Sequence, residues 1–225
     1  MEYPFGDADL DGDGWTDLLL GAPGLGRVGI LSAPPAGEHL VWDIAAATLE
    51  VPISVGSWLD AGDLDQDGTP EVLVGAPHEA PGGVLYILRG PFEGSRDMGT
   101  AEWSIHGDVP LDLTGISMVI ADLDGDDNPD LAVSQPGNGF AGDEGGRVLL
   151  FAGPLAQGAY PATEADVVLL SNGTGAGEFG SGIEAGDLDG DGADDLAITA
   201  WLDEDAAGHP VGSLQLFYGG ADLFP

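Results

Sequence analysis

One acidic pattern, repeated four times, constrains this chain of 225 residues more than any other feature. The repeats begin at Asp9, Asp63, Asp122 and Asp187 and read DLDGDGWTD, DLDQDGTPE, DLDGDDNPD and DLDGDGADD. Successive repeats therefore start 54, 59 and 65 residues apart. This period is too long for leucine-rich or ankyrin units and suits a four-stranded blade of a β-propeller.

Short apolar runs between the acidic segments predict strands rather than helices. Each run is bounded by Gly, Pro or Asn, and none keeps helical spacing over ten or more positions. After the acidic segments, the first expected strands are Leu18–Leu20, Val72–Val74, Leu131–Val133 and Leu196–Ile198, and the second are Arg27–Leu31, Val84–Leu88, Arg147–Phe151 and Ser213–Tyr218. The third are Leu40–Ile44, Glu102–His106 and Ala165–Leu170, and the strands leading into the next acidic segment are Val55–Ala61, Gly115–Ala121 and Gly180–Gly186. We therefore predict an all-β fold.

We expect a single propeller domain over residues 1–225, with blades at approximately 1–54, 55–113, 114–178 and 179–225. The first and last blades are expected to be incomplete, because the inner strand of the first is truncated and the last unit ends before its third strand. Two architectures remain open: an arc of a larger propeller, or a small propeller closed by non-standard pairing. Exposed edge strands favour association, so a homo-oligomer formed through the incomplete terminal blades is also expected.

The acidic segments have the composition of calcium loops. Alternate carboxylates at positions 1, 3 and 5 turn toward one point, position 9 adds a fourth, and position 7 can add its backbone carbonyl oxygen. Calcium takes six to eight such oxygen ligands, whereas a bare loop would carry the repulsion of its carboxylates. We expect about four Ca²⁺ ions, with Asp9, Asp11, Asp13, Trp15 and Asp17; Asp63, Asp65, Asp67, Thr69 and Glu71; Asp122, Asp124, Asp126, Asn128 and Asp130; and Asp187, Asp189, Asp191, Ala193 and Asp195 as ligands.

Position 6 of each loop needs a backbone with positive φ. Gly14, Gly68 and Gly192 supply it in three loops, and Asp127 replaces the glycine in the third. An EF-hand would instead need a bidentate Glu at position 12 between two helices. Position 12 is apolar in all four loops, so the EF-hand is excluded; its residues are Leu20, Val74, Val133 and Ile198.

The overall charge excludes several classes of partner. The chain has 40 Asp and Glu against 4 Lys and Arg, with a formal net charge of −36, so it cannot neutralise nucleic-acid phosphates. A hydrophobic fraction of 43% argues against disorder, and no apolar run is long enough to insert into a membrane. Without cysteine there is no disulfide or thiolate nucleophile, and without lysine there is no phosphate-binding P-loop.

Motifs around the loops carry a family resemblance. Gly21-Ala22-Pro23 and Gly75-Ala76-Pro77 follow the first two loops, and Phe179-Gly180 precedes the fourth by seven residues. With the D-x-D-x-D-G-x-x-D loops, these features make the chain resemble the FG-GAP repeats of integrin α-subunit β-propellers and their bacterial relatives. The chain departs from these motifs at several places. Gly-Ala-Pro is replaced by Ser134-Gln135-Pro136 and Thr199-Ala200-Trp201, and Phe-Gly is replaced by Val55-Gly56 and Thr114-Gly115. Phe5-Gly6 is out of register, because it lies only three residues before Asp9.

The resemblance implies a calcium-binding module for extracellular or cell-surface protein interaction or adhesion, without enzymatic activity. The partner would be another protein or other repeats of a larger surface protein. Two alternatives stay open: an accessory propeller of a secreted or surface enzyme acting on polysaccharide or phospholipid, and a structural spacer. In the family, partners dock on the face opposite the calcium loops, where Gln135–Gly146 and Leu202–Gly212 would lie. Their acidic residues would favour a basic or cation-bridged partner, but the plainer interpretation, which we prefer, is that they are solvated loops.

The remaining chemically distinctive residues suggest no other site. The four histidines lie in different units without metal-ligand spacing; they are His39, His78, His106 and His209. We expect Trp42, Trp58 and Trp103 to pack between blades rather than to stack on sugars. Asn172-Gly173-Thr174 is a formal glycosylation sequon.

Overall fold

The computed structural model describes residues 4–32, 36–50, 58–137, 145–171, 178–205 and 207–225. Its strands form four sheets, each built mainly from antiparallel neighbours in sequence. The first three sheets contain β1 (Pro4–Ala8), β2 (Asp17–Ala22), β3 (Arg27–Leu31) and β4 (Ala47–Glu50); β5 (Leu59–Gly62), β6 (Glu71–Ala76), β7 (Val84–Leu88) and β9 (Trp103–His106); and β10 (Met118–Ala121), β11 (Asp130–Gln135), β12 (Arg147–Phe151) and β14 (Val167–Leu170). The fourth contains β15 (Phe179–Gly186), β16 (Asp195–Ala200) and β17 (Ser213–Phe217).

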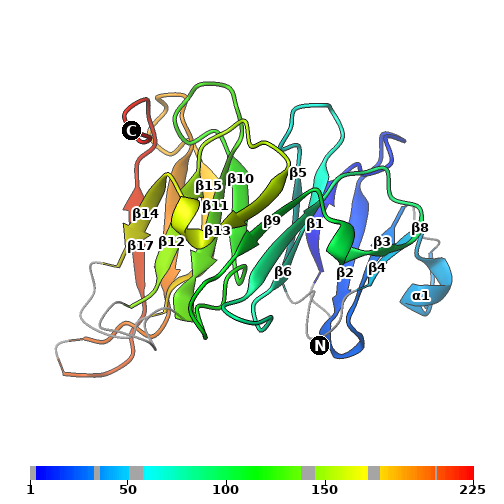
Figure 1. Ribbon diagram of the computed structural model, residues 1–225, viewed down its shortest axis with the longest axis horizontal. Coiled ribbons are helices and arrows are strands. Elements are labelled where there is room, and N and C mark those ends of the chain that lie inside the picture. Colours follow the sequence, from blue (N-terminus) through cyan, green and yellow to red (C-terminus); the bar gives the residue numbers. More distant parts are fainter. Residues whose placement is uncertain (1–3, 33–35, 51–57, 138–144, 172–177, 206) are drawn as a thin grey trace.

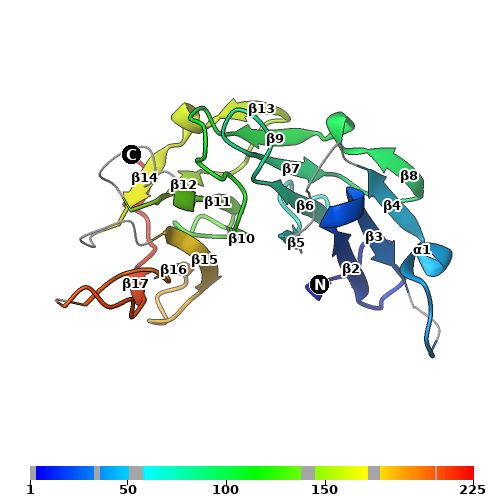
Figure 2. The same cartoon turned by 90° about the horizontal axis from the view of Figure 1, so that it is seen from below.

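The sheets follow one another along an arc, with β5 and β10 on its concave side (Figure 2). The chain is thus all-β and forms a partial β-propeller, as the sequence predicted. Within the described residues, no helix is long and apolar enough to cross a membrane. The division of the chain into blades at the expected boundaries stays a prediction, as does the completeness of the first and last blades.

Two strands that the sequence did not predict connect adjacent sheets. β8 (Gly94–Asp97) pairs in parallel with β4, and β13 (Gly158–Pro161) pairs in parallel with β9. Each belongs to the repeat unit that follows the sheet it extends, so a strand from one unit covers the outer edge of the previous sheet. Both segments are short and largely exposed, and they carry no apolar alternation from which a strand could be predicted.

One expected strand is wrong. Leu40–Ile44 was expected to form the third strand of the first unit, but Val41–Ile44 is the short helix α1, and β4 lies farther along the chain. The helix packs on β3 at Gly29, where a Cβ atom would lie 3.1 Å from Val41 Cγ1 and 3.3 Å from a ring carbon of Trp42. A short apolar run fits a helical turn as well as a strand, and here the absent side chain of Gly29 makes room for the turn.

Within the described residues, 3₁₀ turns include Pro23–Leu25, Met98–Thr100 and Ala162–Glu164. Phe5-Gly6 falls within a register shift of β1, opposite the middle of β2, whereas Phe179 pairs with Ala200 at the far end of β16. The out-of-register position of Phe5-Gly6 is therefore confirmed. Val55-Gly56, the sequon at Asn172-Gly173-Thr174 and residues 138–144 of one long turn lie outside the described residues.

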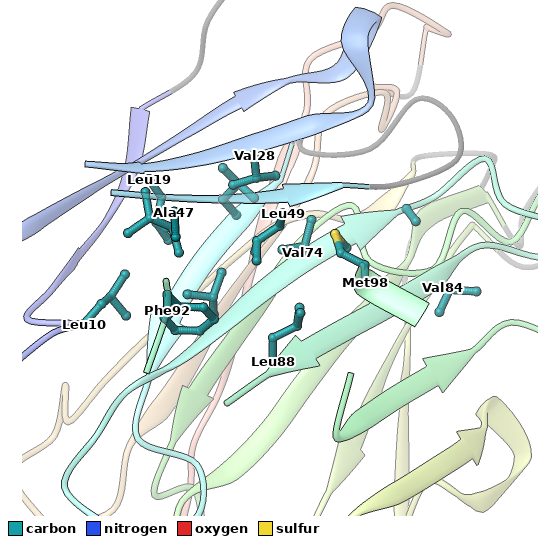
Figure 3. Close-up of a cluster of buried hydrophobic side chains, with 14 residues drawn as sticks. Leu10, Leu19, Val28, Ala47, Leu49, Val74, Val84, Leu88, Phe92 and Met98 are labelled. Atoms are coloured by element: carbon teal, nitrogen blue, oxygen red, sulfur yellow. The ribbon is translucent and has the colours of Figure 1, made fainter. Parts of the chain in front are cut away.

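In the described part of the chain the core consists of three apolar clusters, one between each pair of adjacent sheets. In the first, Leu19, Val28 and Leu49 from the first sheet face Val74 and Leu88 of the second (Figure 3). Alternation along each strand places these side chains on the face that looks toward the next sheet. Burying each of them contributes about 1.5–3 kcal/mol.

Two of the three tryptophans lie between sheets, as expected. Trp103 is buried in the second cluster, with its indole N–H donated to the carbonyl oxygen of Leu155 at 3.1 Å, and Trp58 packs against the same cluster. Trp42 was expected there too, but it lies on the other face of the first sheet, where the Arg27 guanidinium carbon sits 5.9 Å from its ring centroid. α1 places it there, because Gly29 and the cluster residue Val28 occupy opposite faces of β3.

The last sheet exposes an apolar face. Leu214, Leu216 and Tyr218 alternate along β17 and beyond it with exposed fractions of 60%, 47% and 60%. Phe217 points the other way, into the third cluster, and packs edge-on against Phe179 with ring centroids 6.0 Å apart. The exposed residues therefore form a row on the end of the arc, opposite to the face that covers the third cluster.

Candidate metal sites

The four acidic loops lie on one face of the molecule. Each one connects the innermost strand of a sheet to the second strand, as the β1–β2, β5–β6, β10–β11 and β15–β16 connections. Because the sheets stand side by side in the same orientation, all four loops appear at the upper edge in Figure 1. The turn between β16 and β17, which includes the described part of Leu202–Gly212, lies at the lower edge.

The first carboxylate of each loop organises the backbone around it. Oδ1 of Asp9 accepts hydrogen bonds from the amides of Gly12 (2.8 Å) and Asp13 (3.0 Å), and Oδ2 accepts one from Gly14 (2.8 Å). Asp122 repeats this pattern, and Asp63 and Asp187 repeat most of it. The aspartate at position 1 therefore folds the loop before any ion is considered.

Positive φ angles occur at position 6, as predicted, and also at position 4. At position 6 the angles are 88° for Gly14, 87° for Gly68, 68° for Asp127 and 100° for Gly192. Asp127 thus adopts the conformation expected of the glycine it replaces. Position 4 was not predicted to need this conformation, but Gly12, Gly125, Gly190 and the non-glycine Gln66 also have positive φ there. The two left-handed residues turn the chain sharply enough to bring alternate carboxylates together.

Three acidic side chains converge in each loop, with one oxygen of each within 4.8 Å of the others. In three loops the converging residues occupy positions 1, 3 and 9, whereas in the first loop they occupy positions 1, 3 and 5. The groups are Asp9, Asp11 and Asp13; Asp63, Asp65 and Glu71; Asp122, Asp124 and Asp130; and Asp187, Asp189 and Asp195. The structure thus places twelve of the sixteen predicted acidic ligands in clusters, and none of the described clusters includes a histidine.

The other predicted ligands lie beside these clusters. Asp17, Asp67, Asp126 and Asp191 are outside the converging groups. At position 7, the amides of Trp15, Thr69, Asn128 and Ala193 donate to the carboxylate at position 5, over 2.8 to 2.9 Å. Position 7 therefore holds the position-5 carboxylate in place in all four loops.

The acid at position 9 is buried in every loop, with an exposed fraction of 2% or less for Asp17, Glu71, Asp130 and Asp195. One oxygen of each accepts a hydrogen bond from the leucine amide at position 2, over 2.6 to 2.9 Å. This bond ties the end of the loop to its beginning. The sequence shows the acid, but the burial and the bond emerge only from the fold.

The loops form two pairs that differ in the hydrogen bonding of the second oxygen of the position-9 acid. In the third and fourth loops it accepts an amide hydrogen bond, from Gly153 to Asp130 (2.8 Å) and from Gly219 to Asp195 (2.9 Å). In the first two loops it is buried without a hydrogen-bond partner, as Oδ1 of Asp17 and Oε1 of Glu71. A buried carboxylate oxygen with no donor is costly, so a cation beside either of these two atoms would be favourable.

Burial and like charge make two of these acids hard to ionise. Burial raises the pKa of Glu71 to about 7, and the charges of Asp65 and Asp63 add to this effect. Burial likewise raises the pKa of Asp130 to about 6, with Asp124 and Asp126 contributing. At position 5, hydrogen bonds lower the pKa instead: from Arg89 to Asp67, and from Asn128 to Asp126. The clusters therefore hold negative charge that the surrounding fold only partly compensates.

This donor set fits a hard divalent cation. The converging atoms are all carboxylate oxygens, the ligands that calcium and magnesium prefer. Glu71, whose Oε1 is unpartnered, belongs to such a cluster, and Asp17, whose Oδ1 is unpartnered, lies at the corresponding position of the first loop. The donor chemistry and the unpartnered oxygens together mark the loops as candidate metal sites.

Neighbouring loops touch one another. The side-chain amide of Gln66 in the second loop donates to the carbonyl oxygen of Asp127 in the third. The third loop is joined to the fourth by hydrogen bonds between Asp122 and Asp194. Three of the four loops therefore form a continuous acidic surface.

One basic residue of this surface was missed by the sequence analysis. Arg89, directly after β7, directs its guanidinium at the second loop: Nη1 lies 3.1 Å from Asp65 Oδ2, and Nε donates to Asp67 Oδ2 at 3.1 Å. The signal was present in the sequence, because the residues that follow the second strand in the other units are Ser32, Ala152 and Tyr218. Only the fold brings that position next to the loop.

Comparison with known proteins identifies the repeat. The sequence profile of the FG-GAP repeat matches residues 8–37, 55–88 and 114–151, which include the first three acidic loops. The chain carries FG-GAP repeats. The family resemblance inferred from the loops is thus confirmed, and the third loop, with Asp127 in place of glycine, lies within a matched repeat.

Two groups of relatives match this chain. Integrin alpha-7 of Homo sapiens is 30% identical over 196 residues, covering 83% of this chain and 16% of the relative. Phosphatidylinositol-glycan-specific phospholipase D of Mus musculus is 32% identical over 147 residues, covering 57% of this chain and 17% of the relative. The enzyme of the same name from Dictyostelium discoideum is 26% identical over 179 residues, covering 64% and 18%. The chain therefore spans less than a fifth of the length of these relatives.

Proposed function

We propose that this FG-GAP repeat chain is a calcium-binding propeller module, with about four Ca²⁺ ions, that mediates protein–protein interaction or adhesion outside the cell. The observation that carries the proposal is the convergence of three carboxylates in each of four loops on one face. Calcium accommodates irregular oxygen cages, whereas magnesium demands octahedral geometry and keeps its waters. The candidate ligands are the twenty loop residues named above.

In this role calcium acts on stability. A cation in each loop would neutralise carboxylates that otherwise repel and, in the first two loops, would partner the buried oxygens of Asp17 and Glu71. Since the cage forms only in the folded chain, binding free energy becomes folding free energy. The chain's own residues supply the ligands and the loop shape, while the ion supplies positive charge.

Calorimetric titration of the metal-free chain tests the proposal. We expect about four equivalents of calcium to bind and the melting temperature to rise on calcium addition and fall in excess chelator. Magnesium at the same concentration should give a smaller rise. A matched control is Asp222→Asn, which removes one exposed carboxylate outside the loops, against Asp63→Asn within the second loop. Near-zero stoichiometry with a melt that chelator leaves unchanged would refute the proposal.

The face opposite the calcium loops is the proposed partner face. The turn after β16 carries Asp203, Glu204 and Asp205 together with the exposed apolar side chains of Trp201 and Val211. An acidic rim around exposed aromatic and aliphatic groups suits a basic or cation-bridged protein surface. The proposed location of such an interaction is extracellular or at the cell surface.

A homo-oligomer is part of the same proposal. The exposed row of Leu214, Leu216 and Tyr218 on the last sheet resembles half of an inter-sheet core, and a second copy would cover it. β17 is also an outer strand of its sheet. A free edge beside an apolar face favours sheet-to-sheet association.

The second candidate function is that of an accessory propeller in an enzyme acting on phospholipid or polysaccharide. The relatives named phosphatidylinositol-glycan-specific phospholipase D favour it. In either case we propose that this chain itself is not catalytic. Assaying the isolated chain against phosphatidylinositol-glycan and polysaccharide substrates tests this, and turnover that is lost when a loop carboxylate is replaced would overturn it.

A further inference from the structure

The second acidic loop differs from the other three because it holds its own cation. The Arg89 guanidinium reaches two of the loop carboxylates, with Nη1 3.1 Å from Asp65 Oδ2 and Nε and Nη2 both on Asp67 Oδ2. Asp65 belongs to the converging cluster of this loop, and Asp67 is its position-5 acid. The side chains are partly shielded, with exposed fractions of 36% for Arg89, 18% for Asp65 and 31% for Asp67.

A network behind the loop holds Arg89 in this position. Its backbone amide donates to Glu102 Oε2 at 2.9 Å, and its carbonyl oxygen accepts from Arg96 Nη1 at 2.6 Å. Arg96 in turn pairs with Glu102, with Nη2 2.7 Å from Oε1. Since both backbone groups of Arg89 are anchored, its side chain starts from a fixed point beside the loop.

The other loops have no equivalent. In each sheet, the first residue after position 9 of the loop pairs with the last residue of the neighbouring strand. These pairs are Leu18 with Leu31, Val72 with Leu88, Leu131 with Phe151, and Leu196 with Phe217. The residues that follow them are Ser32, Arg89, Ala152 and Tyr218. Arginine thus occurs at one of the four equivalent positions. The third loop, where this position is Ala152, has an acidic cluster with no arginine beside it at this position.

The second loop also has the features of a metal site, namely converging carboxylates and a buried oxygen without a partner. Glu71 is fully buried, its Oε1 has no hydrogen-bond partner, and one of its oxygens lies within 4.8 Å of oxygens of Asp63 and Asp65. Arg89 is on Asp65 and Asp67 and does not bond to Glu71 among the described contacts. A divalent ion bound by this cluster would therefore share Asp65 with the guanidinium and lie close to a like charge.

We propose that Arg89 is a built-in counter-cation that lowers the calcium affinity of the second loop and makes it the last of the four to fill. The proposal rests on the calcium-binding function proposed above and adds a graded response to it. Without calcium, the guanidinium neutralises part of the charge of Asp65 and Asp67 in the second loop. With rising calcium, the other three loops fill first.

Arg89→Ala tests this directly, because a gain of affinity cannot come from misfolding. Two positive charges a few ångströms apart disfavour each other enough to change affinity about tenfold in water. We expect calorimetric titration to show the weakest calcium site of the wild-type chain becoming about tenfold tighter in Arg89→Ala. The gain should shrink at high salt, because the repulsion is screened. In chelator, Arg89→Ala should melt at a lower temperature than the wild type.

Arg27→Ala is the matched control, since it removes the same charge from an arginine that pairs with Glu50 at the other end of the first sheet. It should leave all four affinities unchanged. Ala152→Arg is the reciprocal variant, and it should weaken the calcium affinity of the third loop by about the same tenfold factor. Asp63→Asn should abolish the site that Arg89→Ala tightens, which assigns that site to the second loop.

The outcomes separate this inference from the proposed function. If neither the wild type nor any variant binds calcium, the proposed function fails and this inference fails with it. If about four ions bind but Arg89→Ala and Arg27→Ala titrate alike, only the role of Arg89 is overturned. A gain that persists unchanged at high salt would also overturn it, because the effect would then not be electrostatic.

Discussion

The backbone amide of Asp194 donates a 2.7 Å hydrogen bond to the carbonyl oxygen of Asp122, and the carboxylate of Asp194 accepts a 3.2 Å bond from the amide of Asp122 in return. The two residues are 72 positions apart and belong to adjacent acidic loops. This reciprocal pair fixes the fourth loop against the third, so the acidic face is continuous there.

Asp194→Ala removes the return bond and leaves the amide of Asp122 without its acceptor. We expect the free energy of unfolding to fall by about 1 kcal/mol. Urea denaturation measures this, with Asp222→Ala as a control that removes an exposed carboxylate outside the inter-loop contact. Equal stability of the two variants would show that the contact contributes nothing.

Glu71→Gln should have opposite effects with and without calcium. In chelator it removes a buried, partly unpartnered charge, so the melting temperature should rise. In calcium it weakens a ligand, so the calcium-induced rise should be smaller than in the wild type. Differential scanning calorimetry in both buffers measures the two effects.

Asp195→Asn is the matched contrast to that variant. Both oxygens of Asp195 accept amide hydrogen bonds, so replacing one oxygen by an NH₂ group leaves a donor facing a donor. In chelator its free energy of unfolding should therefore fall by about 1–3 kcal/mol, and its melting temperature should fall with it. If both variants changed in the same direction, the distinction between the two pairs of loops would be wrong.

Asp60 should make the metal-free protein lose stability as the pH rises. Burial raises its pKa from 3.8 to about 6, with a smaller contribution from the charge of Glu184. Between these two values the folded chain binds more protons than the unfolded chain, so the free energy of unfolding decreases with increasing pH. Thermal melts in chelator at about pH 4.5 and about pH 7 cover most of this window.

Asp60→Asn isolates this effect from that of the loop acids. The variant should lose less stability than the wild type between the two pH values, because it carries no titrating group at this position. Identical losses would mean that Asp60 has the same pKa in the folded and unfolded chains.

Trp103→Ala should be among the most destabilising core substitutions. It opens a cavity in the second cluster and leaves the carbonyl oxygen of Leu155 without its indole donor. The expected cost is about 3–5 kcal/mol. Trp42→Ala is the control: the same atoms are lost from a partly exposed site over β3, and the cost measured by urea denaturation should be clearly smaller.

Leu216→Glu should prevent self-association through the last sheet. A carboxylate in the middle of the exposed row would have to be buried in any sheet-to-sheet contact. Sedimentation velocity at micromolar concentration should show an oligomer for the wild type and a monomer for this variant. Leu25→Glu, at an exposed leucine of the first unit, should behave as the wild type. A monomeric wild type would contradict the proposal.

Local sequence was sufficient where the structure depends on neighbours along the chain. The predicted strands Arg27–Leu31, Val84–Leu88 and Arg147–Phe151 agree with β3, β7 and β12 to the residue. Alternating apolar residues between glycines and prolines define such strands, because both signals act over a few residues. The acidic loops were predictable for the same reason, since position 1 bonds to amides only three to five residues away.

Contacts between segments that are distant along the chain could not be predicted from the sequence. α1 replaced an expected strand because Gly29 of β3 has no side chain to exclude it, and β8 and β13 are strands only because a neighbouring sheet offers them an edge. The candidate site divides in the same way. The sequence alone determined which carboxylates could gather and in which loops. Only the tertiary structure decided that Glu71 is buried with an unpartnered oxygen, and that Arg89, 22 residues from Asp67, supplies the second loop with a cation. Spacing along a chain fixes contacts within one turn, whereas burial and charge pairing depend on which strands pack together.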